Sequence, residues 1–213
     1  VGETAAELAR ELAAIDASKV RRAPERPGSV VFLFPGGGAQ YPGMGRGLYE
    51  HEAVYRQAAD ECLAALPAER AAAVRALLFG DHAAPEFGCE LERPSLALPA
   101  LFVTEYALAR TLQSLGVEPE AMLGHSMGEY VAACLAGVFS PADGMRIVLL
   151  RGELFEAVEP SAMLSVPLPA SEVLGENDRE LSLAAANAPQ LSAVGGTVEA
   201  IESLQQRLQA RGV

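Results

Sequence analysis

The chain has 213 residues, half of them hydrophobic, and a formal net charge of −12 at pH 7. This length suits one sizeable core, or one domain and part of another. The negative charge opposes binding to a phosphate backbone, and no apolar run approaches the ~18 residues of a membrane-spanning helix. We therefore expect neither a nucleic-acid partner nor a membrane partner.

The cysteines Cys62, Cys89 and Cys134 are too far apart in the sequence to form a zinc ligand pair. Their odd number and the absence of a charged-then-apolar leader at the start of the chain indicate a reduced, cytoplasmic location. Each is expected to be a small buried side chain. No metal site is expected.

The first 27 residues are expected to form a helix followed by a connector. TAAELARELAAI carries apolar residues at helical spacing, and RRAPERPG is charged and turn-prone. We interpret residues 1–27 as a linker that follows an upstream domain.

Residues 28–159 are expected to form an α/β core around a parallel sheet. SVVFLF (29–34) is a continuous apolar run, which predicts a strand buried on both faces, and EAMLG (120–124) predicts a second, short strand. Helices are expected over residues 45–61, 68–78, 98–116, about 127–137 and 141–158. Ser140 is the expected N-cap of the last helix, with Pro141 in its first turn.

Residues 160–213 show a different pattern of elements. In chain order they are strand MLSVPL, a short helix from Ser171, strand LSLAAA, turn NAPQ, strand LSAVGG and helix 197–210. This β-α-β-β-α order is typical of a ferredoxin-like unit without its last strand. The expected fold class is therefore α/β, with a hydrolase-like parallel-sheet core and an inserted ferredoxin-like subdomain that is incomplete at the C-terminus.

The motif GHSMGEY (124–130) places Ser126 between two glycines, between a predicted strand and a predicted helix. This pattern is a nucleophile elbow, in which a sharp turn exposes the serine hydroxyl near the helix N-terminus. A nucleophilic serine needs a base, but the histidines are His51, His82 and His125, and none follows Ser126. His125 is a poor candidate, because its side chain would have to fold back across the turn.

The loop FPGGGAQYPGMG (34–45) follows the first predicted strand and matches neither glycine-rich phosphate fingerprint. We interpret it as half of an oxyanion hole, in which a backbone N–H of the loop pairs with the N–H of Met127.

Arg151 lies on the predicted helix 141–158. At about 100° per residue, Ile147, Leu154 and Val158 share one face of this helix, and Arg151 projects from its middle. The guanidinium is then either part of a buried ion pair or a fork for a substrate carboxylate.

Four segments, FPGGGAQYPGMG, GHSMGEY, RGELF and ANAP, together resemble the acyltransferase domain of modular polyketide synthases and the related malonyl-CoA:acyl carrier protein transacylases, over residues 28–213. The resemblance implies that Ser126 is the nucleophile, that the N–H groups of Gly37 and Met127 form the oxyanion hole, and that Arg151 binds the extender carboxylate. It places His125 and Asn187 at the substrate site, although a turn-forming role for Asn187 is equally adequate. It also implies that the catalytic histidine lies beyond the end of this chain.

The implied function is the loading of a dicarboxylic extender unit from acyl-CoA onto the phosphopantetheine thiol of an acyl carrier protein, through an acyl-serine. Met127 stands where a glutamine would favour methylmalonyl, so malonyl is favoured and methylmalonyl remains possible. The implied partners are an acyl carrier protein, the ketosynthase domain of the same synthase and the small-molecule acyl-CoA, with no bound cofactor. Residues 1–27 would be the end of a ketosynthase-to-acyltransferase linker.

Two other functions compete with this one. A serine hydrolase or thioesterase of the α/β-hydrolase type uses the same elbow, and it would release free acid from acyl-CoA. A non-catalytic docking module of a megasynthase would need neither the elbow nor an arginine aimed at a carboxylate.

Overall fold

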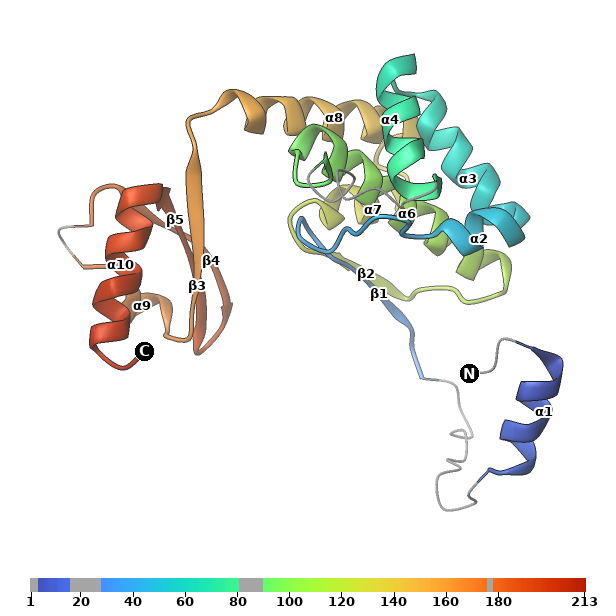
Figure 1. Cartoon of the computed structure of the whole chain (residues 1–213), viewed down its shortest axis with the longest axis horizontal. Coiled ribbons are helices and arrows are strands. Elements are labelled where there is room, and N and C mark those ends of the chain that lie inside the picture. Colours follow the sequence, from blue (N-terminus) through green and yellow to red (C-terminus); the bar gives the residue numbers. More distant parts are fainter. Residues whose placement is uncertain (1–3, 16–27, 81–89, 176–177) are drawn as a thin grey trace. The chain divides into compact units, whose positions relative to one another are not determined.

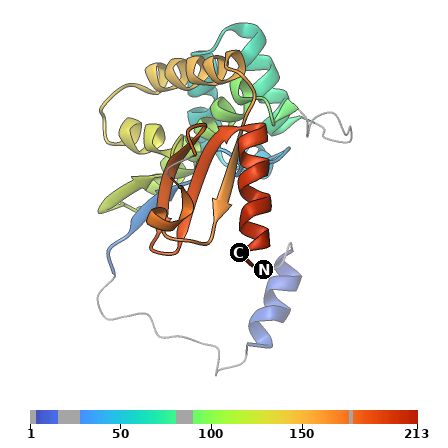
Figure 2. The ribbon, with the colours of Figure 1, turned by 90° about the vertical axis from the view of Figure 1, so that its left-hand side faces the viewer.

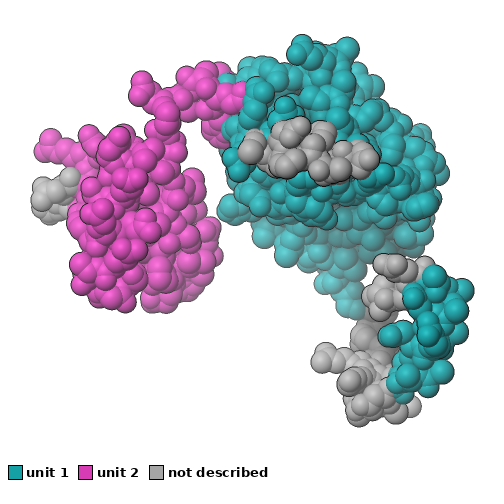
Figure 3. Space-filling model, viewed as in Figure 1, with its two compact units in different colours: residues 1–153 teal, residues 154–213 magenta. Residues whose placement is uncertain are grey.

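The computed structural model describes residues 4–15, 28–80, 90–175 and 178–213 (Figure 1). His82 and Cys89 lie outside these ranges. The chain divides into two compact units, Val1–Glu153 and Leu154–Val213 (Figure 3), which we treat one at a time. Among the described helices, none combines the length and apolar character needed to cross a membrane.

The helix expected near the N-terminus is α1, Ala5–Ala13. A capping box fixes its start: the Glu7 N–H donates to Thr4 Oγ1, and the Thr4 N–H donates to Glu7 Oε2, both at 3.2 Å. Leu8 and Leu12 on this helix are exposed.

The first unit contains a parallel pair of strands, β1 (Val31–Phe34) and β2 (Ala121–Gly124), in register from Val31 opposite Ala121 to Phe34 opposite Gly124. Phe32 and Phe34 are buried, whereas Val31 and Leu33 are 50% and 69% exposed. The prediction that this strand is buried on both faces is therefore wrong for the described part of the chain. Helices of the first unit lie on one face of the strand pair (Figure 1), and the side chains of β1 alternate between exposed and buried positions.

Four described helices lie between the two strands in the sequence. They are α2 (Arg46–His51), α3 (Ala53–Ala64), α4 (Ala68–Phe79) and α6 (Pro94–Ser114). The sequence predicted one helix over 45–61, but Glu52 is extended, with φ −108° and ψ 111°, and separates α2 from α3. Helix α6 begins at Pro94 rather than at residue 98, because proline suits the first helical position. The long α6 is buried along most of its length and forms the centre of the unit's core.

After β2 come α7 (Gly128–Leu135) and α8 (Pro141–Ala157). The expected cap of α8 is present: Ser140 Oγ accepts from the Asp143 N–H at 3.1 Å.

The buried side of α8 differs from the expected one. Its members are Gly144, Met145, Val148, Leu149 and Gly152. A Cβ on Gly144 would lie 2.6 Å from the Phe102 ring, and one on Gly152 would lie 2.5 Å from the Pro94 carbonyl oxygen, so α8 approaches α6 through its glycines.

The prediction of an apolar packing face around Arg151 is wrong, because the side chains expected to form it are exposed. Ile147, Leu154 and Val158 are 38%, 57% and 61% exposed. Counting hydrophobic side chains alone overlooks a packing face that consists partly of glycine.

The second unit is an antiparallel sheet with strand order β3-β5-β4, made of β3 (Ser161–Val166), β4 (Leu181–Ala188) and β5 (Leu191–Thr197). The short α9 (Ala170–Val173) follows β3, and α10 (Val198–Ala210) lies alongside the sheet (Figure 2). The expected β-α-β-β-α order is confirmed. Strand β4 extends to Ala188, however, so Asn187 belongs to a strand and not to the turn NAPQ.

Candidate active site

Ser126 occupies a sharp turn between β2 and α7. The β2 strand ends at Gly124, the His125 N–H donates to the Phe34 carbonyl at 2.9 Å, and α7 begins at Gly128. Among the described residues Ser126 is the one non-glycine residue with positive φ, at 52°. This left-handed conformation costs about 1–2 kcal/mol in a residue with a side chain, and such strain is typical of functional sites.

The glycines around Ser126 are required by close backbone contacts. A Cβ on Gly124 would lie 2.1 Å from the Glu129 nitrogen, and one on Gly128 would lie 2.2 Å from the Phe34 oxygen. The sequence analysis did not single out Gly36, yet a Cβ there would lie 2.8 Å from the His125 oxygen. The loop after β1 therefore lies directly against the elbow, and three consecutive glycines were the signal for it.

The expected oxyanion-hole donors are the N–H groups of Gly37 and Met127. Within the described ranges neither N–H donates to a backbone acceptor of the protein. The Met127 side chain is fully buried in the core, which anchors the start of α7. Gln40, which the sequence analysis missed, holds the loop: its Oε1 accepts from the Gly38 N–H at 2.8 Å, and its Nε2 donates to the Leu91 carbonyl at 3.1 Å.

Arg151 lies beside Ser126. Its Nη2 is 3.5 Å from Ser126 Oγ, and its Nη1 donates to the Tyr130 hydroxyl at 3.2 Å. Its Cζ also lies 5.4 Å from the centroid of the Tyr130 ring. The fold thus brings together two residues singled out from sequence and adds Tyr130, whose position one helical turn after Ser126 was the available signal.

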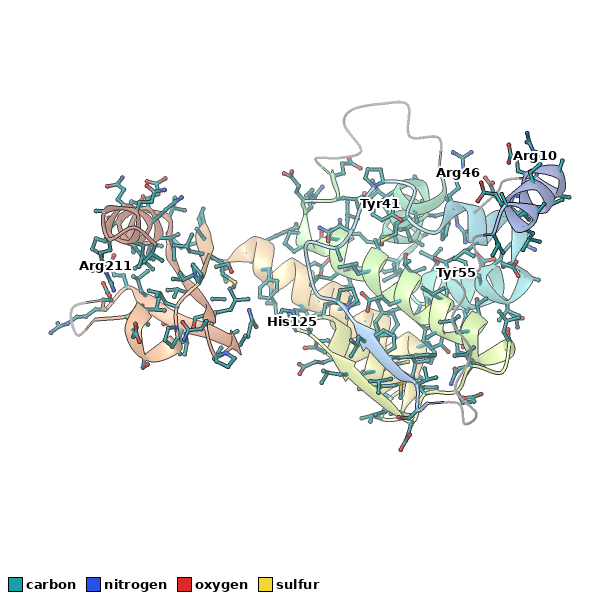
Figure 4. The ribbon with its side chains drawn as sticks, turned by 90° about the horizontal axis from the view of Figure 1, so that it is seen from below. Arg10, Tyr41, Arg46, Tyr55, His125 and Arg211 are labelled. Atoms are coloured by element: carbon teal, nitrogen blue, oxygen red, sulfur yellow. The ribbon has the colours of Figure 1, made fainter. Side chains whose placement is uncertain are left out.

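The other residues named from the sequence are placed as follows. His125 is exposed where β2 gives way to α7 (Figure 4), and the described contacts include no hydrogen bond from its ring to Ser126 Oγ. His51 is exposed at the end of α2. Asn187 is exposed near the end of β4 in the second unit.

A groove of about 440 Å³ runs along β1 and is lined by residues of β1, α2 and α6, with Ser126 outside its lining. Glu105 of α6 is one of the residues that line this largely apolar groove, and its two carboxyl oxygens are buried without a hydrogen-bond partner among the described residues. The side chain is buried, with only 8% of the residue exposed, and burial raises the pKa of its carboxyl to about 8.

The described cysteines Cys62 and Cys134 are buried, as expected. Burial raises the pKa of both thiols, that of Cys134 to about 11, so they stay protonated and are poor nucleophiles at neutral pH. The described residues also include no cluster of His, Cys, Asp and Glu that could hold a metal ion.

Comparison with known proteins adds the following. Residues 31–213 match the family model described as the acyl transferase domain. A phenolphthiocerol/phthiocerol polyketide synthase protein of Mycobacterium tuberculosis is 40% identical over 203 residues, which are 94% of this chain and 13% of that protein.

Two solved structures are also similar. The acyltransferase domain of SpnD, in complex with 2-(pent-4-yn-1-yl)malonyl, is 43% identical with a TM-score of 0.77, over 94% of this chain and 47% of that one. A malonyl-transacylase in complex with its type II polyketide synthase acyl-carrier protein is 29% identical with a TM-score of 0.72, over 87% of this chain and 60% of that one. The chain thus spans a small part of the curated relative and about half of each solved one.

Proposed function

Because the chain belongs to the acyl transferase domain family, a family of transferase enzymes, we propose that it carries the nucleophile and the carboxylate-binding arginine of a polyketide synthase acyltransferase. Its site would load a dicarboxylic extender unit from acyl-CoA onto the phosphopantetheine thiol of an acyl carrier protein. The observation that carries this proposal is the guanidinium of Arg151 beside Ser126, with 3.5 Å between Nη2 and Oγ. A cation next to a strained serine suits an acyl group whose far end is negatively charged.

The proposed reaction has two stages. Ser126 Oγ attacks the thioester carbonyl, a C–O bond forms, the C–S bond breaks, and coenzyme A leaves as the thiol with the serine proton. The thiol of the carrier then attacks the acyl-serine, a C–S bond forms, the C–O bond to Ser126 breaks, and the thiol proton returns to Oγ. In both stages the N–H groups of Gly37 and Met127 and the N-terminus of α7 would stabilise the oxyanion.

The acyl group would be malonyl, with methylmalonyl as the alternative. Arg151 would hold its free carboxylate through two parallel N–H···O bonds, while His125 and Asn187 would contribute to the substrate site. The SpnD domain was solved with a substituted malonyl group, which supports the dicarboxylic class. Since the Met127 side chain lies in the core, it would influence extender choice through the position of the elbow and not by touching the substrate.

The base that deprotonates Ser126 would come from a part of the domain outside these 213 residues. The described residues place the Arg151 guanidinium next to Ser126 Oγ, and a guanidinium cannot accept a proton. General-base assistance is typically worth about 100-fold to 10,000-fold in rate, so this contribution would be essential.

We further propose the domain limits 1–27 for the linker, 28–159 for a hydrolase-like core and 160–213 for an incomplete ferredoxin-like subdomain. The order β3-β5-β4 supports the last assignment, because it is the order of the first, third and second strands of that fold. An acyl carrier protein is the proposed partner, as in the solved complex of the malonyl-transacylase, together with a ketosynthase domain of the same cytoplasmic synthase.

The test is covalent labelling of the full-length protein with malonyl-CoA, followed by intact-mass measurement. The wild type should gain one malonyl group, Ser126→Ala should gain none, and Ser203→Ala, which changes an exposed serine on α10, should label normally. Labelling that persists in Ser126→Ala would refute the assignment. Release of free malonate without transfer to the carrier would indicate a hydrolase, and an unlabelled wild type would indicate a docking module.

A further inference from the structure

Tyr130 contacts Arg151 in two ways at once. Its hydroxyl accepts a hydrogen bond from Nη1 at 3.2 Å, and its ring lies beneath the guanidinium, with 5.4 Å from Cζ to the ring centroid. The ring itself is partly buried against the main core of the unit. A side chain packed against the core therefore contacts the guanidinium with both its hydroxyl and its ring.

This support matters because an arginine side chain is long and mobile. Holding it in one rotamer costs side-chain entropy that the substrate would otherwise have to offset on binding. Arg151 is only partly buried. Tyr130 lies in the first turn of α7, four residues after Ser126, so the residue that contacts the guanidinium follows the nucleophile closely in the chain.

We propose that Tyr130 is a positioning residue. It keeps the guanidinium of Arg151 next to the hydroxyl of Ser126 and thereby sets the preference for carboxylated over neutral acyl groups. This inference rests on the proposed function of Arg151. Loss of the hydroxyl removes one bond to the cation, and loss of the ring removes the surface beneath it. Both changes should weaken selection of the carboxylate, whereas the chemistry at Ser126 itself should continue.

A second tyrosine provides a matched control. Tyr49 on α2 makes the same pair with Arg75: Nη1 of Arg75 donates to the Tyr49 hydroxyl, and its Cζ lies 5.6 Å from the ring centroid. The Tyr49 ring stacks on Phe79 of α4, and its hydroxyl also donates to Asp60 at 2.9 Å. Tyr49→Phe therefore disrupts an equivalent tyrosine–arginine pair that does not include Ser126.

The experiment compares malonyl and acetyl transfer by the full-length protein. Tyr130→Phe should lower kcat/KM for malonyl-CoA about 10-fold, mainly through KM, and Tyr130→Leu about 100-fold, with acetyl transfer unchanged. Tyr49→Phe should lower thermal stability and leave the malonyl-to-acetyl ratio unchanged. In an Arg151→Ala background, Tyr130→Phe should have no further effect on the ratio, because the two residues act as a unit.

An unchanged ratio in Tyr130→Phe, or equal losses for both acyl groups, would overturn the inference. Arg151→Ala separates this failure from failure of the proposed function. If Arg151→Ala lowers the ratio and Tyr130→Phe does not, only the role of Tyr130 is wrong. If Arg151→Ala leaves the ratio unchanged, the carboxylate-binding role of Arg151 is wrong, and the inference falls with it.

Discussion

The buried carboxyl of Glu105 should make the stability of the chain depend on pH. Burial raises its pKa from an ordinary value of 4.5 to about 8, so the folded chain holds a proton over a range in which the unfolded chain has released it. A raised pKa contributes stability that is complete below pH ~4.5 and is lost as pH rises towards 8. Tyr41 is the other titratable residue among the described residues that line the groove, and a phenol offers no positive charge to pair with a carboxylate.

The size of the effect follows from the shift. Each pH unit inside the window lowers the free energy of unfolding by at most about 1.4 kcal/mol, which amounts to at most about 3.5 kcal/mol at pH 7. Glu105→Gln imitates the protonated carboxyl and removes this dependence. The variant and the wild type should therefore have similar free energies of unfolding near pH 5. From there to pH 8 the free energy of unfolding of the wild type should fall steadily below that of the variant.

Urea denaturation followed by circular dichroism at pH 5, 6, 7 and 8 measures this difference. Glu120→Gln, which changes an exposed carboxylate just before β2, is the control and should follow the wild type at every pH. If the stability curves of wild type and Glu105→Gln ran parallel across the whole range, the carboxyl would have a compensating partner, and the assignment of an uncompensated burial would be refuted.

Two further changes test the site and its support. Arg151→Ala should cut malonyl transfer about 100-fold and spare acetyl transfer, and steady-state kinetics with both thioesters would show equal losses if the arginine were structural. Gly152→Ala should destabilise the protein by about 3 kcal/mol, because the new Cβ would lie 2.5 Å from the Pro94 oxygen. Gly47→Ala in α2 adds a Cβ with no neighbouring atom within 4 Å, so it should instead stabilise the protein by up to ~1 kcal/mol. Thermal melts that gave the two variants equal stability would contradict the close packing of Gly152.

The elements with local signals were predictable from the sequence. The elbow at Ser126 follows from two glycines between a strand and a helix, and the start of α8 follows from Ser140 and Pro141. The break at Glu52 had no such signal, because the chain turns there without glycine or proline.

Features that depend on tertiary contacts were harder to predict from the sequence. The exposure of Leu33 depends on which faces of the strand pair receive helices, and the strand pattern alone does not specify this. The buried side of α8 was misassigned because Gly144 and Gly152, which have no side chain, allow the helix backbone to pack closely there. Tyr130 was missed because its contact is with a residue on another helix.

The left-handed conformation of Ser126 lowers the stability of the fold at the same position where the proposed function requires a serine. Glycine adopts a φ of 52° without the steric penalty that a serine carries, so the most stable residue at position 126 is one that cannot form an acyl-enzyme. Any engineering programme that selects variants of this chain by thermal stability alone would drift towards glycine there and lose the nucleophile first. Position 126 should therefore be held fixed whenever the scaffold is stabilised.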